Sequence, residues 1–326
     1  MKNVRLTQQA APVPQNYVSV ARVCYLHYVK GMTQSAIADL LGIGRPRVSR
    51  LLQKGVEDGT VKFDITFAGY FPEIEQDLQK TYRGVKFVVA EPLDGTFEET
   101  RYSISRTAAD FLDVILKPGE RVAVGMGTTL RETAEHLTAE LEGTEFVAMV
   151  GGRRGVGLDI HANSVVEQLS RNTGGVAVEM FSPALAGSDK ECEALKGLPL
   201  IKETLRMAAS ANTCIFSIED PSSSASTLSL AGYHTEQDVV DLRANDVVCD
   251  VMSIGFYNRQ AERVATEISN RAVSISEAEF RAIPRKVCVA GGDRKHESIS
   301  VALDAGLIDV LVTDAYTGEY LLGRRE

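Results

Sequence analysis

Three short segments near the start of the chain have apolar residues at helical spacing, with every third or fourth position hydrophobic. The first covers residues 18–29, the second covers residues 34–41, and the third begins near Arg45 and Pro46. A glycine follows each of the first two segments, as is common where a helix ends. Proline is favourable in the first turn of the third segment because its nitrogen would have no helical partner there. The pattern therefore predicts three consecutive helices.

The spacing of small and apolar residues across the second and third helices is typical of a helix-turn-helix. Counted from Gln34 as position one, Ala38 is the fifth residue, Gly42 the ninth, Val48 the fifteenth and Leu51 the eighteenth. The small residue lets two short helices cross closely, the glycine allows the turn, and the aliphatic residues fill the space between the helices. In this motif the N-terminal part of the later helix enters the major groove of DNA.

Arginines are concentrated at the start of the third helix, where they would meet a nucleic acid. Arginine reads guanine through two hydrogen bonds, or it binds the phosphate backbone alone. The candidate DNA-binding residues are Thr33, Gln34, Arg45, Arg47, Ser49 and Arg50. Residues 60–65 alternate apolar and polar side chains like a strand, which would add a wing to the motif. The alternative is an ordinary three-helix packing unit with a basic surface.

Charge is distributed unevenly along the chain, whose net charge is −9. Residues 1–62 contain nine basic and three acidic residues, a balance of +6, whereas the remainder contains 26 basic and 41 acidic residues, a balance of −15. A basic head on an acidic body is typical of a small DNA-binding module joined to a domain that does not touch DNA. The acidic total therefore does not argue against DNA binding.

Short β-rich segments alternate with helical segments over the rest of the chain. Strand-like runs occupy residues 85–90, 121–125, 145–150, 176–180, 213–218, 246–250, 286–290 and 310–313. Helical stretches that lie between them include residues 102–116, 130–141 and 298–305. This alternation predicts an α/β fold with a Rossmann-like parallel sheet that helices cover on both faces. Ligands of such sheets bind beyond the carboxyl ends of the strands.

A glycine–threonine turn follows one of these expected strands. Gly125, Gly127, Thr128 and Thr129 stand where the strand ends and a helix begins. Glycine lets a ligand approach the backbone, and the N–H groups at a helix start, together with the threonine hydroxyls, would form a cradle for an anion. A phosphate ester or a polyol would suit it. The alternative is a tight turn with a threonine cap and no ligand.

A second candidate ligand loop follows the next expected strand. Gly151 and Gly152 are followed by Arg153, whose planar donor fork suits phosphate or carboxylate. Asp159 and Asn163 lie a few residues later and could contact ligand hydroxyls. The alternative is a solvated loop in which these side chains bind nothing.

Several classes of site find no support in the sequence. The chain has no GxxxxGK[ST] loop, and its glycine–threonine turn lacks the third glycine of GxGxxG. The five cysteines are Cys24, Cys192, Cys214, Cys249 and Cys288. Their odd number and their scattered positions without CxxC spacing argue against a disulfide framework and a zinc site. We expect no cofactor, no metal and no disulfide.

The sequence also predicts where the protein is found. No apolar run approaches the roughly 18–20 residues of a membrane span, and the first residues lack the apolar core of a signal peptide. The expected location is the cytoplasm.

Several motifs, taken in their order, resemble the SorC family of sugar-responsive regulators, the DeoR-like members with a sugar-binding domain. The DNA-binding segment of that family resembles MTQSAIADLLGIGRPRVSRLLQKGVEDGTVKFDI at residues 32–65. Its effector-domain blocks resemble RVAVGMGTTLRETAEHL, VAMVGGRRG, NDVVCDVMSIGFYN, VCVAGGDRKHESISVAL and GLIDVLVTDAYTGEYLL. Nearly the whole chain after residue 16 is covered.

The resemblance implies both an organisation and a function. It implies a disordered tail at 1–16, a winged helix-turn-helix domain at 17–67, a linker helix at 68–83 and an effector domain at 84–326 with a sugar-phosphate isomerase-like fold. Asp250 and Lys295 join the candidate effector-binding residues because they lie in blocks that resemble those of the family. The implied function is regulation of a carbohydrate or polyol operon, controlled by a sugar, polyol or sugar phosphate. Repression that the effector releases is the simpler form of this control, and activation is the alternative. The family implies a homo-oligomer, a dimer or tetramer, and the linker helix could contribute a dimer contact.

An enzyme is the main alternative class. Sugar-phosphate isomerases also cradle phosphate with glycine–threonine loops, so this chain could be such an enzyme with an accessory DNA-binding head. An isomerase needs a positioned acid and base. No catalytic spacing is evident here, and we expect no catalytic residue.

Overall fold

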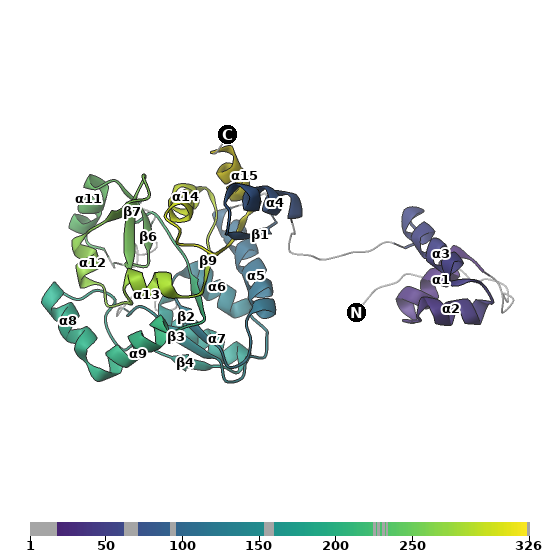
Figure 1. Cartoon of the computed structure of the whole chain (residues 1–326), viewed down its shortest axis with the longest axis horizontal. Helices are drawn as coiled ribbons and strands as arrows, with labels where there is room; N and C mark the ends of the chain where they lie inside the picture. Colours follow the sequence, from purple (N-terminus) through teal and green to yellow (C-terminus); the bar gives the residue numbers. More distant parts are fainter. Residues whose placement is uncertain are drawn as a thin grey trace. The chain divides into compact units, whose positions relative to one another are not determined.

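The computed structural model describes two compact units, which divide between residues 66 and 67 (Figure 1). It describes residues 18–61, 71–91, 96–152, 160–223, 226, 229, 232 and 234–324. The expected tail at 1–16 and most of the expected wing at 60–65 lie outside these residues. No helix in the described part of the chain is long and apolar enough to cross a membrane.

The smaller unit contains the three expected helices. The first is α1 (Val20–Cys24), which continues without a break as the π-helical turn η1 (Tyr25–Val29). The second is α2 (Gln34–Leu41), and the third is α3 (Arg45–Glu57). The sequence pattern did not predict the π-helical turn.

Local signals define the turn between α2 and α3. The Thr33 hydroxyl accepts the N–H of Ala36 at 3.2 Å and so caps the start of α2. Gly42 ends the helix in the left-handed region, with φ 64°, where glycine pays no steric penalty. Gly44 precedes α3 and has no side chain to cap it.

The three helices enclose a small apolar core of their own. Its buried residues are Val23, Cys24, Ile37, Ala38, Leu41, Val48 and Leu52. Gly55 is a further close contact, because a Cβ atom at this position would overlap the sulfur of Cys24. The third helix therefore packs against the first through a residue that has no side chain.

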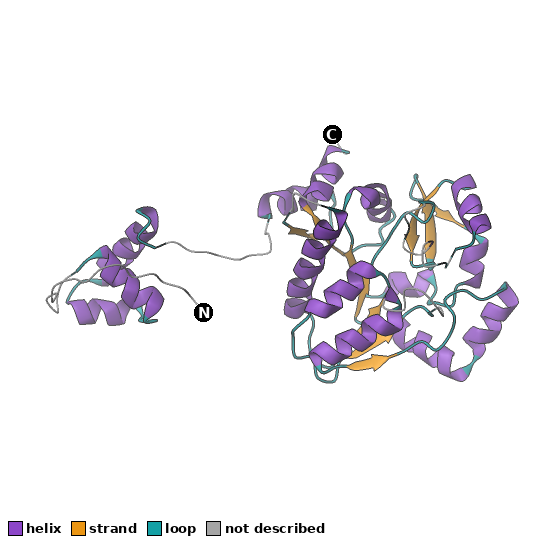
Figure 2. Cartoon of the chain, turned by 180° about the vertical axis from the view of Figure 1, so that it is seen from behind, coloured by secondary structure: helices purple, strands orange, loops and turns teal. Residues whose placement is uncertain are grey.

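The larger unit is built on a seven-stranded parallel sheet (Figure 2). In spatial order its strands are β1 (Lys86–Ala90), β10 (Val310–Asp314), β9 (Arg285–Val289), β5 (Thr213–Phe216), β2 (Arg121–Val124), β3 (Glu145–Ala148) and β4 (Val176–Val178). From β2 the chain adds β3 and β4 on one side, and β5 and β9 then extend the sheet on the other side. The connections after β2 and β5 therefore diverge, which opens a crevice at the carboxyl ends of these strands.

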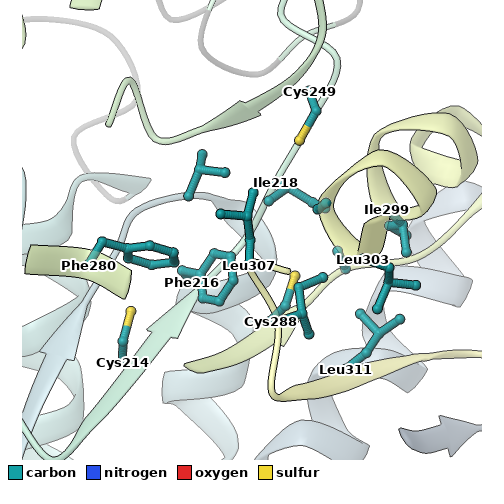
Figure 3. Packing of buried hydrophobic residues seen from close by; sticks show 14 of the residues in the cluster. Cys214, Phe216, Ile218, Cys249, Phe280, Cys288, Ile299, Leu303, Leu307 and Leu311 are labelled. Carbon is teal, nitrogen blue, oxygen red and sulfur yellow. The ribbon is translucent and has the colours of Figure 1, made fainter. Parts of the chain in front are cut away.

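Helices cover both faces of this sheet, as the alternating pattern predicted. One apolar cluster joins the sheet to α5 (Phe97–Ile115), α6 (Thr128–His136) and α7 (Ala162–Thr173). The cluster on the other face joins it to α4 (Pro72–Thr81), α13 (Glu277–Ala282), α14 (His296–Asp304) and α15 (Ala315–Gly323). Figure 3 shows part of this second cluster, where Phe216 and Phe280 meet edge to face with ring centroids 5.1 Å apart. Two further helices, α8 (Asp189–Gly197) and α9 (Pro199–Ala209), lead from β4 to β5.

One expected strand belongs to a different sheet. The run at 246–250 forms β6 (Val247–Val251), which pairs antiparallel with β7 (Gly255–Asn258) rather than entering the parallel sheet. The short strand β8 (Arg263–Val264) completes this second sheet, and α11 (Glu236–Ala244) and α12 (Glu267–Arg271) flank it in the chain. The other seven expected runs overlap strands of the parallel sheet.

The linker helix packs on its own unit. Ile74 and Leu78 form its apolar stripe, and both face Gly318 of α15, where a Cβ atom would lie 2.8 Å from Ile74 and 3.4 Å from Leu78. Leu78 is fully buried. The stripe that we considered as a dimer contact is thus occupied within the chain. The five cysteines are free and buried.

Candidate functional site

A pocket that is partly open to solvent lies at the carboxyl ends of β2, β5 and β9. Its lining comes from the starts of α5 and α6, the segments after β5 and β9, and the end of β6. The lining residues are Phe97, Arg101, Met126, Gly127, Thr128, Thr129, Ser217, Ile218, Glu219, Asp250, Met252 and Lys295. This is the place where the topology opens a crevice in a sheet of this kind.

The glycine–threonine turn contributes one wall of the pocket. Gly127 has φ 127°, a conformation open to glycine, and its N–H donates to the carbonyl of Ile160 at 2.8 Å. That amide is therefore used within the protein. Thr128 and Thr129 form the first turn of α6, where backbone N–H groups have no acceptor within the helix. Of the groups that we expected to form an anion cradle, those of Thr128 and Thr129 line the pocket, whereas the Gly127 N–H is already bonded to Ile160.

Gly125 lies beneath the pocket rather than in its lining. Its N–H donates to the carbonyl of Ile215 at 2.9 Å, which ties β2 to β5. A Cβ atom at this position would overlap the sulfur of Met252. Glycine here leaves room for the Met252 side chain to pack against the backbone.

Lys295 brings a positive charge to the pocket from the loop after β9. Its Nζ atom donates to the Ser217 hydroxyl at 3.2 Å. Burial of this ammonium group lowers its pKa, and the nearby carboxylate of Glu219 opposes that shift. The expected candidate Lys295 thus meets Ser217 and Glu219, which the sequence did not single out.

Asp250 is a buried carboxyl group at the end of β6. Its Oδ1 atom accepts the N–H of Ser253 at 2.6 Å, whereas Oδ2 accepts no hydrogen bond from the described residues. Burial raises the pKa of this carboxyl well above its usual range, because the charged form is poorly solvated. The backbone of Asp250 pairs with that of Glu219, with the Asp250 N–H 2.9 Å from the Glu219 carbonyl.

Arg101 supplies a second cation that the sequence pattern did not indicate. It comes from α5 and pairs with Glu132 of α6 at 2.8 Å. The Glu132 carboxylate also accepts the Ser105 hydroxyl at 3.3 Å. Phe97, one turn before Arg101, lies under the guanidinium of Arg294 at 5.1 Å from its ring centroid. The first turns of α5 thus add a charged group and an aromatic ring to the pocket.

Three other candidates lie away from this pocket. The Gly151 N–H donates to the Val273 carbonyl at 3.1 Å, and a Cβ atom there would overlap the carbonyl of Pro183. The Asn163 amide clamps the backbone of Met180, donating to its carbonyl at 3.1 Å and accepting its N–H at 2.8 Å. Gly152 lines a separate hollow with Asn163.

The remaining two candidates of the second ligand loop, Arg153 and Asp159, lie outside the described residues. Within the described residues, therefore, the structure gathers Gly127, Thr128, Thr129, Asp250 and Lys295 of the expected effector set. It also shows no cluster of three or more side chains that could hold a metal ion among those residues.

The candidate DNA-binding residues lie on the outside of the smaller unit. Arg45, Arg47, Ser49 and Arg50 are exposed on α3, whereas Val48 on the same helix is fully buried. Thr33 is exposed and Gln34 is half-buried at the start of α2. The arginine side of α3 therefore does not pack into the core of its own unit.

Known proteins with similar sequences are regulators. Residues 70–323 match the Sugar-bind family model, described as "Putative sugar-binding domain". The chain is 29% identical to the transcriptional regulator LsrR of Enterobacter sp. (strain 638), over 93% of this chain and 92% of that protein. It is 28% identical to the sorbitol operon regulator of Klebsiella pneumoniae, over 93% of this chain and 97% of that protein.

Solved structures of similar fold lead to the same family. The full-length sorbitol operon regulator SorC from Klebsiella pneumoniae matches with a TM-score of 0.71 and 26% identity, over 93% of this chain and 98% of that one. A DeoR family transcriptional regulator from Listeria monocytogenes matches with a TM-score of 0.71 and 25% identity, over 77% of this chain and 98% of that one. These relatives are named as transcriptional regulators and not as enzymes, which argues against the isomerase-like alternative. The chain belongs to the SorC family of sugar-binding transcriptional regulators.

Proposed function

We propose that α3 binds operator DNA and that a sugar, polyol or sugar phosphate in the pocket beyond β2, β5 and β9 controls this binding. The observation that carries the proposal is the convergence of Lys295, Thr128 and Thr129 on one pocket at the crevice of the sheet. Exposed arginines on α3 support the DNA-binding half. The name of one relative, the sorbitol operon regulator of Klebsiella pneumoniae, supports a carbohydrate or polyol as the effector.

The chemistry of the pocket favours a ligand with both an anionic group and hydroxyls. Lys295 and the first turn of α6 provide a cation and helix N–H groups, which suit phosphate. Glu219 and Asp250 provide carboxyl oxygens, which suit hydroxyl groups. A phosphorylated polyol or sugar therefore satisfies more of this pocket than a neutral sugar does.

Control of DNA binding requires that the two ligands favour different conformations. Each then weakens the other by the same factor, commonly about 1–3 kcal/mol of coupling free energy. We propose repression that the effector relieves, in the cytoplasm, by a homo-oligomer. A dimer would place two recognition helices about one turn of DNA apart on a near-palindromic site. A tetramer would contain two such pairs.

Two measurements on the full chain test this function. The first is thermal unfolding with sorbitol, sorbitol 6-phosphate, ribose, ribose 5-phosphate and inorganic phosphate, because a ligand that binds only the folded state raises its stability. The second is a gel shift on the DNA upstream of the gene, with and without each compound that stabilises the protein.

We expect at least one phosphorylated compound to raise the melting temperature and to change DNA affinity. The double variant Thr128→Ala with Thr129→Ala should lose both effects and still bind DNA. A compound that shifts the melting temperature of this double variant as much as that of the wild type would place the ligand in another pocket. No DNA binding by the wild type would refute the regulatory function itself.

A further inference from the structure

The loop that carries Lys295 is clamped to the start of α15. The N–H of Gly292 donates to the Asp314 carboxylate at 2.7 Å and lies 3.1 Å from the Thr317 hydroxyl. Asp314 also caps α15, because its carboxylate accepts the Thr317 N–H at 2.9 Å and the Thr317 hydroxyl at 2.6 Å. Asp314 and Thr317 are both fully buried. One carboxylate therefore fixes the pocket loop and the first turn of a helix together.

The same loop is held tightly on both sides of this clamp. A Cβ atom at Gly291 would overlap the Asp314 carboxylate, so the loop backbone lies directly against the carboxylate. Gly292 accepts the Lys295 N–H at 2.9 Å through its carbonyl, which closes the short turn before the pocket lysine. The next residue, His296, stacks on Tyr320 of α15 with ring centroids 4.4 Å apart. A shift of Lys295 therefore changes the contacts of α15 at two points.

Helix α15 in turn holds the linker helix α4. Gly318 gives the close approach to Ile74 and Leu78 described above, and the Tyr82 hydroxyl donates to the Leu321 carbonyl at 3.3 Å. On its other side α4 is tied to the edge strand β1, because the Glu75 carboxylate accepts the N–H of Val89 at 2.9 Å. In sequence α4 is the first described helix after the DNA-binding unit.

We propose that Asp314 is a positioning residue that couples the Lys295 loop of the pocket to the linker helix through α15. The inference rests on the proposed function, since it assigns the route by which ligand binding in the pocket would affect the DNA-binding unit. Packed elements joined by buried hydrogen bonds shift together, because each bond is costly to leave unmade. The contacts run without a gap from Lys295 through Gly292, Asp314 and Gly318 to Leu78.

Hydrogen exchange on the full chain, without DNA or effector, tests this route. The pocket is perturbed by Lys295→Met, the clamp by Asp314→Asn, and both changes are combined in a third protein. Exchange is followed in peptides that cover residues 72–82 and 291–296. Asp293→Asn is the matched control, because it removes a charge from the same loop at an exposed residue, whose carboxylate accepts the neighbouring Arg294 N–H.

Lys295→Met should change exchange in α4 by about fivefold, because a shift of the pocket loop alters the contacts that α15 makes with α4. Asp314→Asn should speed exchange in α4 by at least as large a factor, because it weakens the buried clamp itself. Adding Lys295→Met to the Asp314→Asn variant should change exchange in α4 no further. Asp293→Asn should leave α4 at the wild-type rate. If Asp314→Asn does not fold, Thr317→Val gives the same test, because its hydroxyl bridges Gly292 and Asp314.

Two results would overturn the proposal. One is an exchange rate in α4 that Lys295→Met leaves unchanged. The other is a double variant in which the rate changes by the product of the two single-variant factors, as it does for independent substitutions. Neither result depends on DNA or effector, so failure of this route and failure of the proposed function are separate outcomes.

Discussion

The Nζ atom of Lys295 lies 3.2 Å from the hydroxyl oxygen of Ser217, so an ammonium group from the loop after β9 meets the residue that follows β5. Glu219, two residues later, lies close enough to oppose the lowering of the lysine pKa by burial. A basic group whose pKa is lowered in the folded state is less stable there in its charged form than in the unfolded chain, so it reduces the stability of the folded protein. The arrangement is suited to an anion that enters the pocket and interacts with this cation.

Lys295→Met should therefore raise the melting temperature while it removes the stabilising effect of a phosphorylated ligand. We expect a rise of about 2–4 °C for each 1 kcal/mol gained. In the wild type, the unfolding free energy should increase as pH rises from the lowered pKa toward 10.5, because the unfolded state binds the proton more tightly. The variant should lack this increase. Thermal unfolding across that alkaline range measures both effects.

The control is Lys190→Met, which removes the same charge at an exposed position of α8. It should leave the melting temperature and the ligand effect unchanged. A lower melting temperature for Lys295→Met than for the wild type would contradict the argument, since it would mean that Lys295 stabilises the empty pocket.

A second prediction concerns Asp250, whose pKa is raised by burial. In the unfolded chain this carboxyl has its ordinary pKa of 3.8, so the folded protein keeps the proton at pH values where the unfolded chain has released it. The unfolding free energy contributed by this group should therefore fall as pH rises above 3.8, until the raised pKa of the folded state is passed. Asp250→Asn should remove this fall, because an amide does not titrate.

Urea unfolding of both proteins between about pH 5 and about pH 8 measures the difference. Asp241→Asn, at an exposed position of α11, is the control and should follow the wild type. Equal pH dependence in the wild type and Asp250→Asn would show that Asp250 ionises normally in the folded state.

The sequence predicted part of the site by two routes. Lys295 was expected only because it lies in a block that resembles one of the SorC family. Thr128 and Thr129 could be found from the fold, because a parallel sheet binds ligands beyond the carboxyl ends of its strands. The same rule, applied to the strand expected at 213–218, would have found Glu219. It would have missed Ser217, because the expected strand includes this residue, whereas β5 ends at Phe216. Arg101 could not be found in this way, because it reaches the pocket from the side of α5, and only the packing of α5 against α6 brings it there.

Glycines misled the sequence interpretation where they serve packing. Gly125 and Gly151 follow strands just as Gly127 does, yet they accommodate Met252 and Pro183 instead of lining the pocket. A glycine after a strand shows that something packs closely against the backbone, but it does not show whether this is a ligand or another part of the protein. The expectation that residues 246–250 join the parallel sheet was wrong for a related reason. A fully buried strand has the same apolar sequence pattern in a parallel and in an antiparallel sheet.

The exposed arginines of α3 lead to a third prediction. Arg47→Ala and Arg50→Ala should each weaken operator binding and leave ligand-induced stabilisation intact. Loss of a phosphate contact should lower the slope of log affinity against log salt by about 1, whereas loss of a guanine contact should cost about 1–3 kcal/mol at one base pair. Gel shifts on the operator and on single-base variants, at several salt concentrations, distinguish the two roles.

Lys54→Ala is the matched control for this prediction. It removes one exposed charge from the same helix, two turns after Arg47, near the end that would point away from the groove. It should weaken binding less than either arginine variant. The recognition surface would have to be placed elsewhere if Lys54→Ala weakened binding more than both.

The last prediction concerns Gly55, which lies buried between α3 and α1. Gly55→Ala should favour the helix by its intrinsic propensity, by roughly 1 kcal/mol, yet destabilise the smaller unit overall. The added methyl group would overlap the Cys24 sulfur and press on Val20, and overpacking of this kind costs about 1–3 kcal/mol. DNA binding should weaken at temperatures where the smaller unit begins to unfold, while ligand binding by the larger unit persists.

Gly44→Ser is the control, because a side chain at this open N-cap position should be tolerated and can cap α3. Calorimetry of the full chain measures both variants, and an unchanged or higher melting temperature for Gly55→Ala would show that α1 and α3 do not pack as closely as described.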